Sequence, residues 1–503
     1  MSTTGKILSG TFWTTVCTVI GAAYSFFATP ILIRYFGSAN YGLVSLAVSL
    51  NVCVGLADIG MNTTNVRFFS IWIQEKNWQK VNRLFRTSLF VYGVMGLVNL
   101  LVLIIVFFYS GRLFNVSQSE IIILKHLLLV VILSSLLSWF VSCFEQLIRA
   151  TENVGWLQKI SMLPRLLLIV VLISTILLEL SIEVYLALTL FVGFVTIPLQ
   201  VNKIKKEIPH ISFVPQFDKT VFREVLPYSI NIFSFAIFQF FFFNLRPAII
   251  GIQGEIESVT DFRILDGVVN VVAMLPGIFF SVLLPTSSRV VASGNQEQLE
   301  KIAYDGTKYL SVFISLIVFG MMTIGHDLLM LYVGEAFSHL TIWLYLWLFI
   351  ILGNHTNFIS SLMLSQPNLR PLMYNTAFSS LIGLASCWFL VPYLQVGGAV
   401  ISLGLYSISQ MIFYYVYFWP SLFRLDGWRI MRHCVIPSAL SGLVIFIFCN
   451  NLPHTQSNLC NICVFGLIFV ALYALSLKII LNKKDMQFIR ELVVNKYNFR
   501  NRL

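Results

Sequence analysis

A few charged side chains lie within or beside long apolar stretches of the sequence. Arg34 follows Pro30 by four residues, and Arg246 stands directly before Pro247. A guanidinium group can bind two phosphate oxygens at once, and a proline can kink a membrane helix and free a carbonyl group. The two arginines are therefore predicted to bind an oxyanion in a cavity or, alternatively, to reach the head groups at the membrane surface.

Lys125 and Arg67 are the other cations predicted to lie on such a path, with anchoring at the membrane interface as the alternative for Lys125. Asp58 is an acid well inside an apolar run. On a straight helix it would lie ~26 Å beyond Tyr41, past the middle of the membrane. It is predicted either to couple an ion or to form a structural hydrogen bond, since the neighbouring Gly60 would let another helix approach.

A polar patch interrupts a later apolar stretch at Asn354, His355 and Asn357. Amide and imidazole groups can form hydrogen bonds with sugar hydroxyls, so these residues are predicted sugar contacts, and the alternative for His355 is a packing histidine. Glu145 and Arg149 are four residues apart, which predicts an ion pair on one helix face, at the rim of the membrane.

Motifs of enzymes are absent from the sequence. It contains no G-x-x-x-x-G-K-[ST] phosphate loop, no H-E-x-x-H and no D-x-D pair. We therefore predict no catalytic residues, no metal and no cofactor. Cys460 and Cys463 form a lone C-x-x-C without a second ligand pair, so they are predicted to be structural.

The composition indicates the environment in which these residues act. Of the 503 residues, 57% are hydrophobic and only 11% are charged, whereas soluble domains carry about a quarter charged residues. We therefore predict an all-α polytopic membrane protein with about 14 transmembrane helices of ~20 apolar residues each. The predicted spans are 11–33, 41–66, 87–109, 121–147, 160–178, 183–201, 225–250, 266–288, 308–331, 338–364, 371–391, 397–419, 431–449 and 460–481.

The charges predict which side of the membrane each loop occupies. If the N-terminus is cytoplasmic, most of the 33 Lys and Arg fall on inner loops and in the C-terminal tail, and the outer loops lean acidic. This bias predicts an even number of spans with both termini in the cytoplasm. It also explains the net charge of +11 by topology, which argues against nucleic-acid binding.

The basic stretch at residues 203–206 separates two groups of six spans. Pro30-x6-Gly37 and Pro247-x6-Gly254 occupy corresponding places in the two groups, as an internal repeat predicts. The predicted organisation is an N-terminal six-helix lobe, a cytoplasmic linker, a C-terminal six-helix lobe, and an extra helix pair with a basic tail, at residues 1–201, 202–224, 225–420 and 421–503.

Residues 30–70 resemble a known family. The stretch from Pro30 to Gly37 is followed by Tyr41-Gly42 and by an element that runs from Leu56 to Met61 and includes Asp58. These motifs are similar to those of the bacterial oligosaccharide flippases, polysaccharide transporters within the superfamily that includes the multidrug and toxin extruders. Leu275-Pro276 and Leu284-Pro285 resemble the paired-proline helix of that family. Two departures are Phe36 where leucine is usual, and fourteen spans where twelve are commonest.

The resemblance implies two six-helix lobes around a central cavity in the bacterial inner membrane. It implies a transporter whose substrate is undecaprenyl diphosphate carrying an oligosaccharide, such as the repeat unit of the O-antigen of lipopolysaccharide or of a capsule. A polysaccharide polymerase and a chain-length regulator are candidate partners. A multidrug exporter is the alternative, although acids rather than cations would be expected in its cavity. A membrane glycan polymerase or ligase is disfavoured because the outer loops are short.

Overall fold

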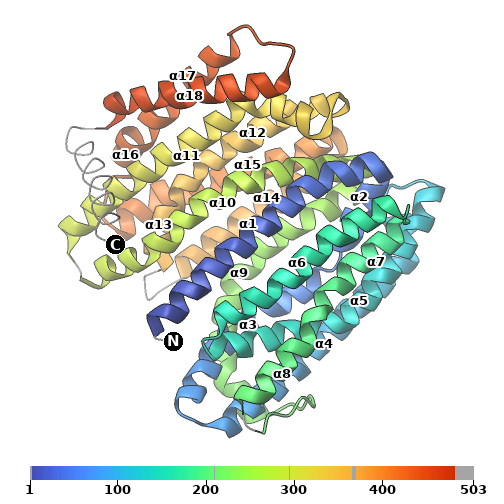
Figure 1. The fold of residues 1–503 in the computed structure, drawn as a ribbon. Helices are drawn as coiled ribbons and strands as arrows, with labels where there is room; N and C mark the ends of the chain where they lie inside the picture. The colour runs from blue at the N-terminus through green and yellow to red at the C-terminus, as the bar shows by residue number, and fades with distance from the viewer. Residues whose placement is uncertain (1–2, 209, 294, 365–369, 482–503) are drawn as a thin grey trace. The chain divides into compact units, whose positions relative to one another are not determined.

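A computed structural model describes residues 3–208, 210–293, 295–364 and 370–481. Within these ranges the backbone alone is described at residues 3–11, 52–59, 136, 137, 139, 231, 232, 235, 275–293, 364 and 479. The described chain is a series of helices joined by short connections, with no strand in this part of the chain (Figure 1). The prediction of an all-α polytopic membrane protein is confirmed.

Eighteen α-helices follow one another along the described residues. They are α1 (Thr3–Phe36), α2 (Ser38–Ser49), α3 (Val52–Gln74), α4 (Trp78–Leu113), α5 (Gln118–Ala150), α6 (Val154–Leu177), α7 (Ile182–Val192), α8 (Ile197–Glu207), α9 (Lys219–Gln253), α10 (Ile256–Ser293), α11 (Gln296–Val333), α12 (Thr341–Ile351), α13 (Asn357–Leu364), α14 (Arg370–Leu394), α15 (Val396–Phe413), α16 (Gly427–Ile430), α17 (Ile436–Asn450) and α18 (Asn458–Ile480). Short turns of other helical type join several of them, at η1 (Gly193–Thr196), η2 (Glu335–Leu340), η3 (Leu352–Thr356), η4 (Tyr414–Leu422) and η5 (Met431–Val435).

Twelve of the described helical segments are long and apolar enough to cross a membrane, and each corresponds to a predicted span. The two predicted spans outside this set are 41–66 and 266–288. The second lies within α10, where the side chains of residues 275–293 are not described. The first differs from the prediction in its backbone.

The chain between α2 and α3 leaves helical geometry at Asn51, so the prediction of one continuous helix over 41–66 is wrong. Asn51 has φ −79° and ψ 38°, and its side-chain oxygen accepts a hydrogen bond from Asn99 Nδ2 at 2.7 Å. Asparagine favours such breaks because its side chain competes with backbone hydrogen bonding. Asp58 therefore lies in the second turn of a new helix, and the distance predicted from Tyr41 along a straight helix does not apply.

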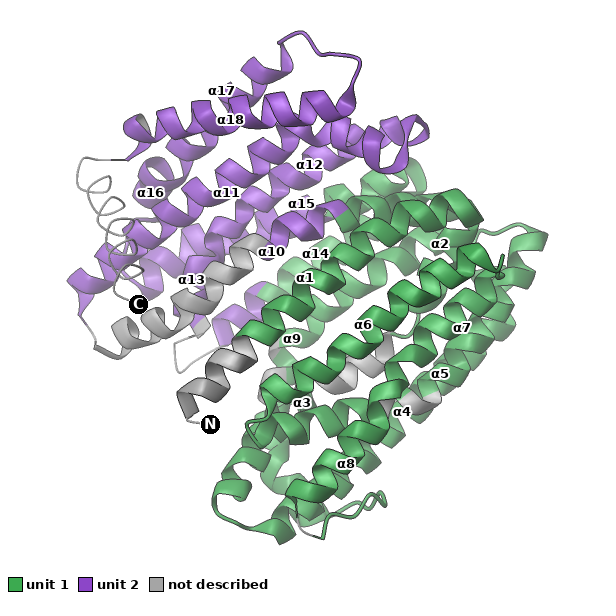
Figure 2. Ribbon diagram, in the orientation of Figure 1, with its two compact units in different colours: residues 1–267, 376–402 green, residues 268–375, 403–503 purple. Residues whose placement is uncertain are grey.

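Packing divides the chain into two compact units (Figure 2). Unit 1 comprises residues 1–267 and 376–402, and unit 2 comprises residues 268–375 and 403–503. The boundaries fall within α10, α14 and α15. The predicted division into six-helix lobes stays a prediction, because a transport lobe is defined by what moves together rather than by packing alone.

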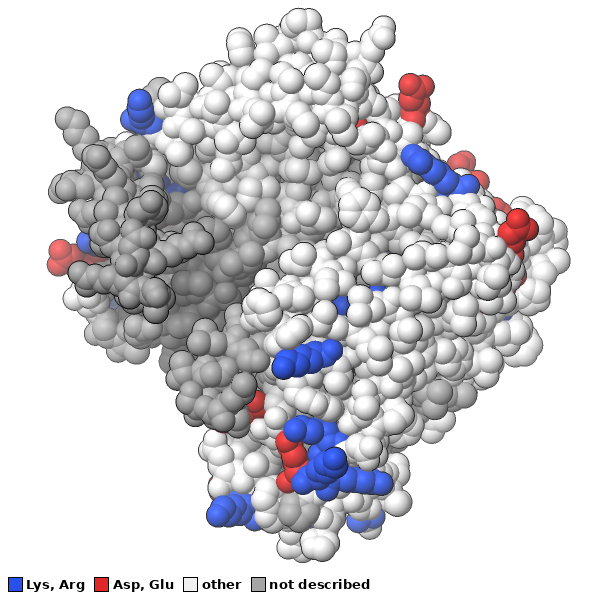
Figure 3. All heavy atoms as spheres, viewed as in Figure 1, with Lys and Arg blue, Asp and Glu red and all other residues white. Residues whose placement is uncertain are grey.

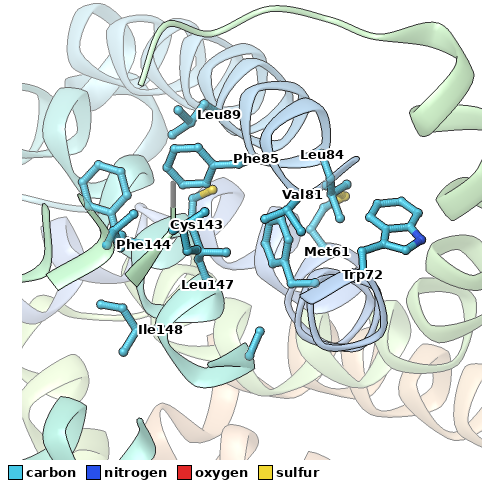
Figure 4. Packing of buried hydrophobic residues seen from close by; sticks show 14 of the residues in the cluster. Met61, Trp72, Val81, Leu84, Phe85, Leu89, Cys143, Phe144, Leu147 and Ile148 are labelled. Atoms are coloured by element: carbon cyan, nitrogen blue, oxygen red, sulfur yellow. The ribbon is translucent and has the colours of Figure 1, made fainter. Parts of the chain in front are cut away.

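The core of unit 1 is built where α3, α4 and α5 meet. Met61, Phe85 and Phe144 are among the buried side chains there, and the rings of Phe85 and Phe144 stack 6.0 Å apart (Figure 4). The ring of Phe213, from the loop after α8, lies 5.5 Å from Phe85 and 5.7 Å from Phe144. Because this loop residue packs against the core, the connection between the two predicted lobes is anchored to unit 1.

Hydrogen bonds hold the same connection along the start of α4. The backbone N–H of Ser212 donates to Asn82 Oδ1 at 2.8 Å, and Arg86 Nε donates to the carbonyl of Val214 at 3.0 Å. Lys and Arg gather at this end of unit 1, around α8 and the loop after it, whereas the visible surface over α1, α6 and α7 is largely uncharged (Figure 3). The predicted linker is therefore held against unit 1, and it begins in a region rich in Lys and Arg.

Four buried polar side chains tie α3, α4 and α5 together. Asn65 Nδ2 donates to Gln146 Oε1 at 2.7 Å, Ser88 Oγ donates to Asn65 Oδ1 at 3.1 Å, and Gln146 Nε2 donates to the Tyr92 hydroxyl at 2.6 Å. Asn65 and Ser88 are completely buried. Because an unsatisfied amide in an apolar interior is costly, this network makes the three helices depend on one another.

Replacing Asn65 with alanine is expected to destabilise unit 1, because it removes the hydrogen bonds of Asn65 to Gln146 Oε1 and to the Ser88 hydroxyl in a buried position. The expected loss is about 1–3 kcal/mol of unfolding free energy. The measurement is the thermal-unfolding midpoint of the purified chain in detergent. Asn62→Ala is the matched control, since Asn62 is exposed on the same helix. Equal midpoints for the two variants would contradict a stabilising role for the network.

Candidate functional site

Arg246 is an enclosed cation near the end of α9. Its side chain is buried, with 3% exposure. The guanidinium carbon lies 5.2 Å from the ring centres of Phe242 and Phe243 and 5.1 Å from that of Phe262 on α10. A cation among aromatic faces is stabilised by their quadrupoles, and the planar guanidinium suits such stacking. The rings therefore hold Arg246 inside the protein in a defined orientation.

Arg67 lies near the opposite end of α9. It is exposed on α3, and its guanidinium carbon stacks 4.3 Å from the ring centre of Tyr228 on α9. Tyr228 and Arg246 are 18 residues apart on that helix, which corresponds to ~27 Å along its axis. The structure therefore places these two predicted cations far apart along α9 rather than in one cluster.

Lys125 and Arg246 lie toward the same end of unit 1. The backbone N–H of Asn115, between α4 and α5, donates to the carbonyl of Gly251 on α9 at 3.2 Å, which places the start of α5 beside the end of α9. Lys125 is half-buried on α5, and its ammonium group lies 5.8 Å from the ring centre of Phe107. This geometry suits a partly embedded cation at the membrane interface.

Arg34 is an exposed residue in the last turn of α1. The hydroxyl of Thr260 on α10 donates at 2.5 Å to the carbonyl of Ser38, the first residue of α2, which places the turn after α1 beside the start of α10. Arg34 thus shares an end of unit 1 with Arg246 and Lys125, and only Arg67 of the four predicted cations lies elsewhere.

The predicted sugar contacts lie in unit 2, at the turn η3. His355 is buried, and its two ring nitrogens are 2.7 Å from the carbonyl of Leu352 and 2.8 Å from the hydroxyl of Tyr415. Contact between His355 and a sugar would require one of these bonds to break. Asn354 and Asn357 are half-buried on either side of it.

The remaining predicted features are the ion pair on α5 and the acid Asp58 on α3. Glu145 and Arg149 form the expected ion pair on α5, with an oxygen–nitrogen distance of 3.3 Å. The side chain of Asp58 lies outside the described residues, so its role stays a prediction. Among the residues that are described, no group of three or more His, Cys, Asp or Glu is arranged to hold a metal ion.

A row of hydroxyl groups on α1 was not among the predicted site residues. Thr14, Thr18 and Ser25 are all exposed within a helix long and apolar enough to span the membrane. Their spacing of four and seven residues places them on one helix face. Val19 and Phe27 are also exposed, at 60% and 64%, but lie on another face. Exposed polar groups in a membrane helix favour contact with water, and exposed apolar groups favour contact with lipid, so α1 has two distinct outer faces.

Cysteines on the two faces of α1 are expected to react differently with a charged methanethiosulfonate reagent. In a cysteine-free background, Thr18→Cys and Ser25→Cys should react on the order of tenfold or more faster than Val19→Cys, because only a hydrated thiol ionises and meets the reagent. Labelling rates of membranes containing the full chain provide the measurement. Similar rates at positions 18 and 19 would show that both faces meet the same solvent.

Comparison with known families identifies the chain more closely. Residues 7–291, more than half of the chain, match the family described as polysaccharide biosynthesis protein. No curated protein sequence matches the chain.

Several solved membrane proteins share the fold. The structure is similar to that of the lipid II flippase MurJ in an inward closed conformation, with a TM-score of 0.74 and 13% identity over 95% of this chain and 99% of that one. It is less similar to an inward-facing multidrug resistance MATE family transporter of the MOP superfamily, with a TM-score of 0.57 and 14% identity over 86% and 96% of the two chains. The eukaryotic MATE transporter AtDTX14 gives a TM-score of 0.55 at 12% identity over 87% and 100%. Since the family match covers residues 7–291, this chain belongs to the polysaccharide biosynthesis protein family.

Proposed function

We propose that the protein is a flippase that moves an undecaprenyl-diphosphate-linked oligosaccharide repeat unit across the bacterial inner membrane for O-antigen or capsule assembly. The observation that carries the proposal is Arg246, a cation inside a membrane protein of the polysaccharide biosynthesis family, buried among three aromatic rings. A diphosphate is the part of such a substrate that hydrocarbon excludes most strongly, and a preoriented guanidinium is suited to bind it.

The positions of the other cations support a path rather than a single pocket. Arg67 and Arg246 lie near opposite ends of α9, and Lys125 and Arg34 lie toward the end that holds Arg246. In the proposed mechanism the anionic head passes from one cation to the next while the lipid tail stays in the bilayer. Asn354 and Asn357 are proposed to contact sugars, and Asp58 to couple an ion or to stabilise its helix.

The proposed setting follows from the charge distribution and the family. Both termini are placed in the cytoplasm, two six-helix lobes surround the substrate, and the C-terminal helix pair is available to a partner. A polysaccharide polymerase and a chain-length regulator are the proposed partners. A multidrug exporter is the competing function, since it shares the fold, and the cations described here argue for an anionic substrate instead.

Complementation of a host that lacks its O-unit flippase tests this function. The wild-type chain is expected to restore surface polysaccharide in a host with a compatible repeat unit. Arg246→Gln should lower the restored amount by roughly tenfold or more at matched membrane abundance, because a charge-assisted contact to phosphate is lost. Arg34→Ala is expected to act in the same direction with a smaller effect, since Arg34 is exposed.

Arg429→Gln is the matched control, because Arg429 has a side chain that is 61% exposed and lies 3.9 Å from Glu300. It should complement as well as the wild type. If no host in a panel regains polysaccharide while cells expressing the chain export toxic cations, the flippase function is wrong. Asp58→Asn would then be the informative variant, since loss of export with that change would indicate coupling through the carboxylate.

A further inference from the structure

Arg165 lies near the middle of α6, a helix long and apolar enough to span a membrane. A span of 160–178 would place it near one end, whereas α6 begins at Val154. Arg165 is therefore 11 residues into a helix of 24 residues, ~16 Å from its first residue. A charge near the middle of an apolar helix of this length needs a specific reason.

The guanidinium of Arg165 crosses α1 at Gly21. Its Nη1 atom occupies the position where any residue larger than glycine would place Cβ, and its central carbon lies 3.3 Å from that position. The helices α1 and α6 run side by side (Figure 1). Glycine at position 21 is thus what makes room for the cation between two packed helices.

Neither helix supplies an acid for this cation. The sequences of α1 and α6 contain no Asp or Glu. Among the described side chains, the acids that form ion pairs have other partners, and none of them pairs with Arg165. A half-buried guanidinium that has no acid on either of its two helices is suited to bind an anion from outside the helix pair.

Hydroxyl groups flank the place where the guanidinium reaches α1. Thr18 is three residues before Gly21 and Ser25 is four residues after it, so both neighbour Gly21 on the helix surface. Both residues are exposed. The Thr18 hydroxyl donates to the carbonyl of Thr14 at 2.8 Å, and rotation about its side-chain bond would let it donate to an oxyanion instead. One guanidinium and two hydroxyls therefore lie around one point on the polar face of α1.

We propose that Arg165, Thr18 and Ser25 form a binding site for the phosphate oxygens of a lipid-linked anion where α1 and α6 meet, near the middle of α6. This inference rests on the proposed function. It adds a further binding site to the proposed path, besides the cations near the two ends of α9. Gly21 is the positioning residue of the site, because it sets where the guanidinium lies.

Native mass spectrometry of the full chain in detergent tests the site with two probes, undecaprenyl diphosphate and phosphatidylglycerol. Arg165→Gln is expected to weaken binding of undecaprenyl diphosphate roughly tenfold or more, because charge-assisted hydrogen bonds are lost. Phosphatidylglycerol binding should stay within about twofold. If phosphatidylglycerol binding falls equally, the site serves ordinary lipid head groups and the proposal is overturned.

Gly21→Ala provides a second test that keeps every charged group in the chain. The added methyl group needs the place of the guanidinium, so binding of undecaprenyl diphosphate should fall in the same direction as with Arg165→Gln. Gly93→Ala is its control, since a Cβ at position 93 of α4 would meet nothing within 4 Å. Lys159→Gln is the control for charge, because Lys159 is an exposed cation of α6 beside Trp13. Both controls should bind as the wild type does.

The outcomes separate this inference from the proposed function. If the wild-type chain binds undecaprenyl diphosphate and neither Arg165→Gln nor Gly21→Ala weakens it, the site is wrong and the flippase function stands. If the wild-type chain does not bind undecaprenyl diphosphate, the proposed function fails first. If Arg165→Gln does not fold, Gly21→Ala and Arg165→Lys decide the question, since both retain the charge and alter only its geometry.

Discussion

The cost of placing polar groups in hydrocarbon is the constraint on which the rest of the structure depends. It requires that backbone groups be satisfied within helices, and it requires a partner for each buried side chain that carries a dipole or a charge. Asn65, Ser88 and Gln146 meet this requirement through one another, and Arg246 is enclosed by aromatic rings. Arg165 has no acidic partner on its own helix or on α1. It is therefore the residue that points most directly to a bound anion.

The guanidinium groups of Arg246, Arg67 and Arg165 are accommodated in different ways. Arg246 lies among three ring faces, which fix its orientation and shield it from lipid. Arg67 stacks on a single ring and stays exposed, so it is free to meet a ligand at one end of the path. The guanidinium of Arg165 lies against Gly21 of α1, where the missing side chain leaves room for it.

The anchored loop after α8 affects how any transport movement is understood. Ser212, Phe213 and Val214 are fixed to α4 and to the core of unit 1 by hydrogen bonds and ring contacts. The long helix α9, which begins the predicted second lobe, packs within unit 1 against α3. Because this loop and α9 both pack within unit 1, we expect them to move together with α3 and α4.

The sequence by itself determined the membrane class, the positions of most spans and the ion pair of Glu145 with Arg149. These depend on local quantities, namely the length of apolar runs relative to the bilayer and the spacing of residues on one helix. Only the tertiary structure decided that the helix over 41–66 breaks at Asn51, that Arg246 is buried, and that Arg165 crosses α1 at Gly21. Each of these depends on which face of a helix packs against a neighbour that is distant in sequence. A helix that is hydrophobic on every side does not show in its sequence which face that is.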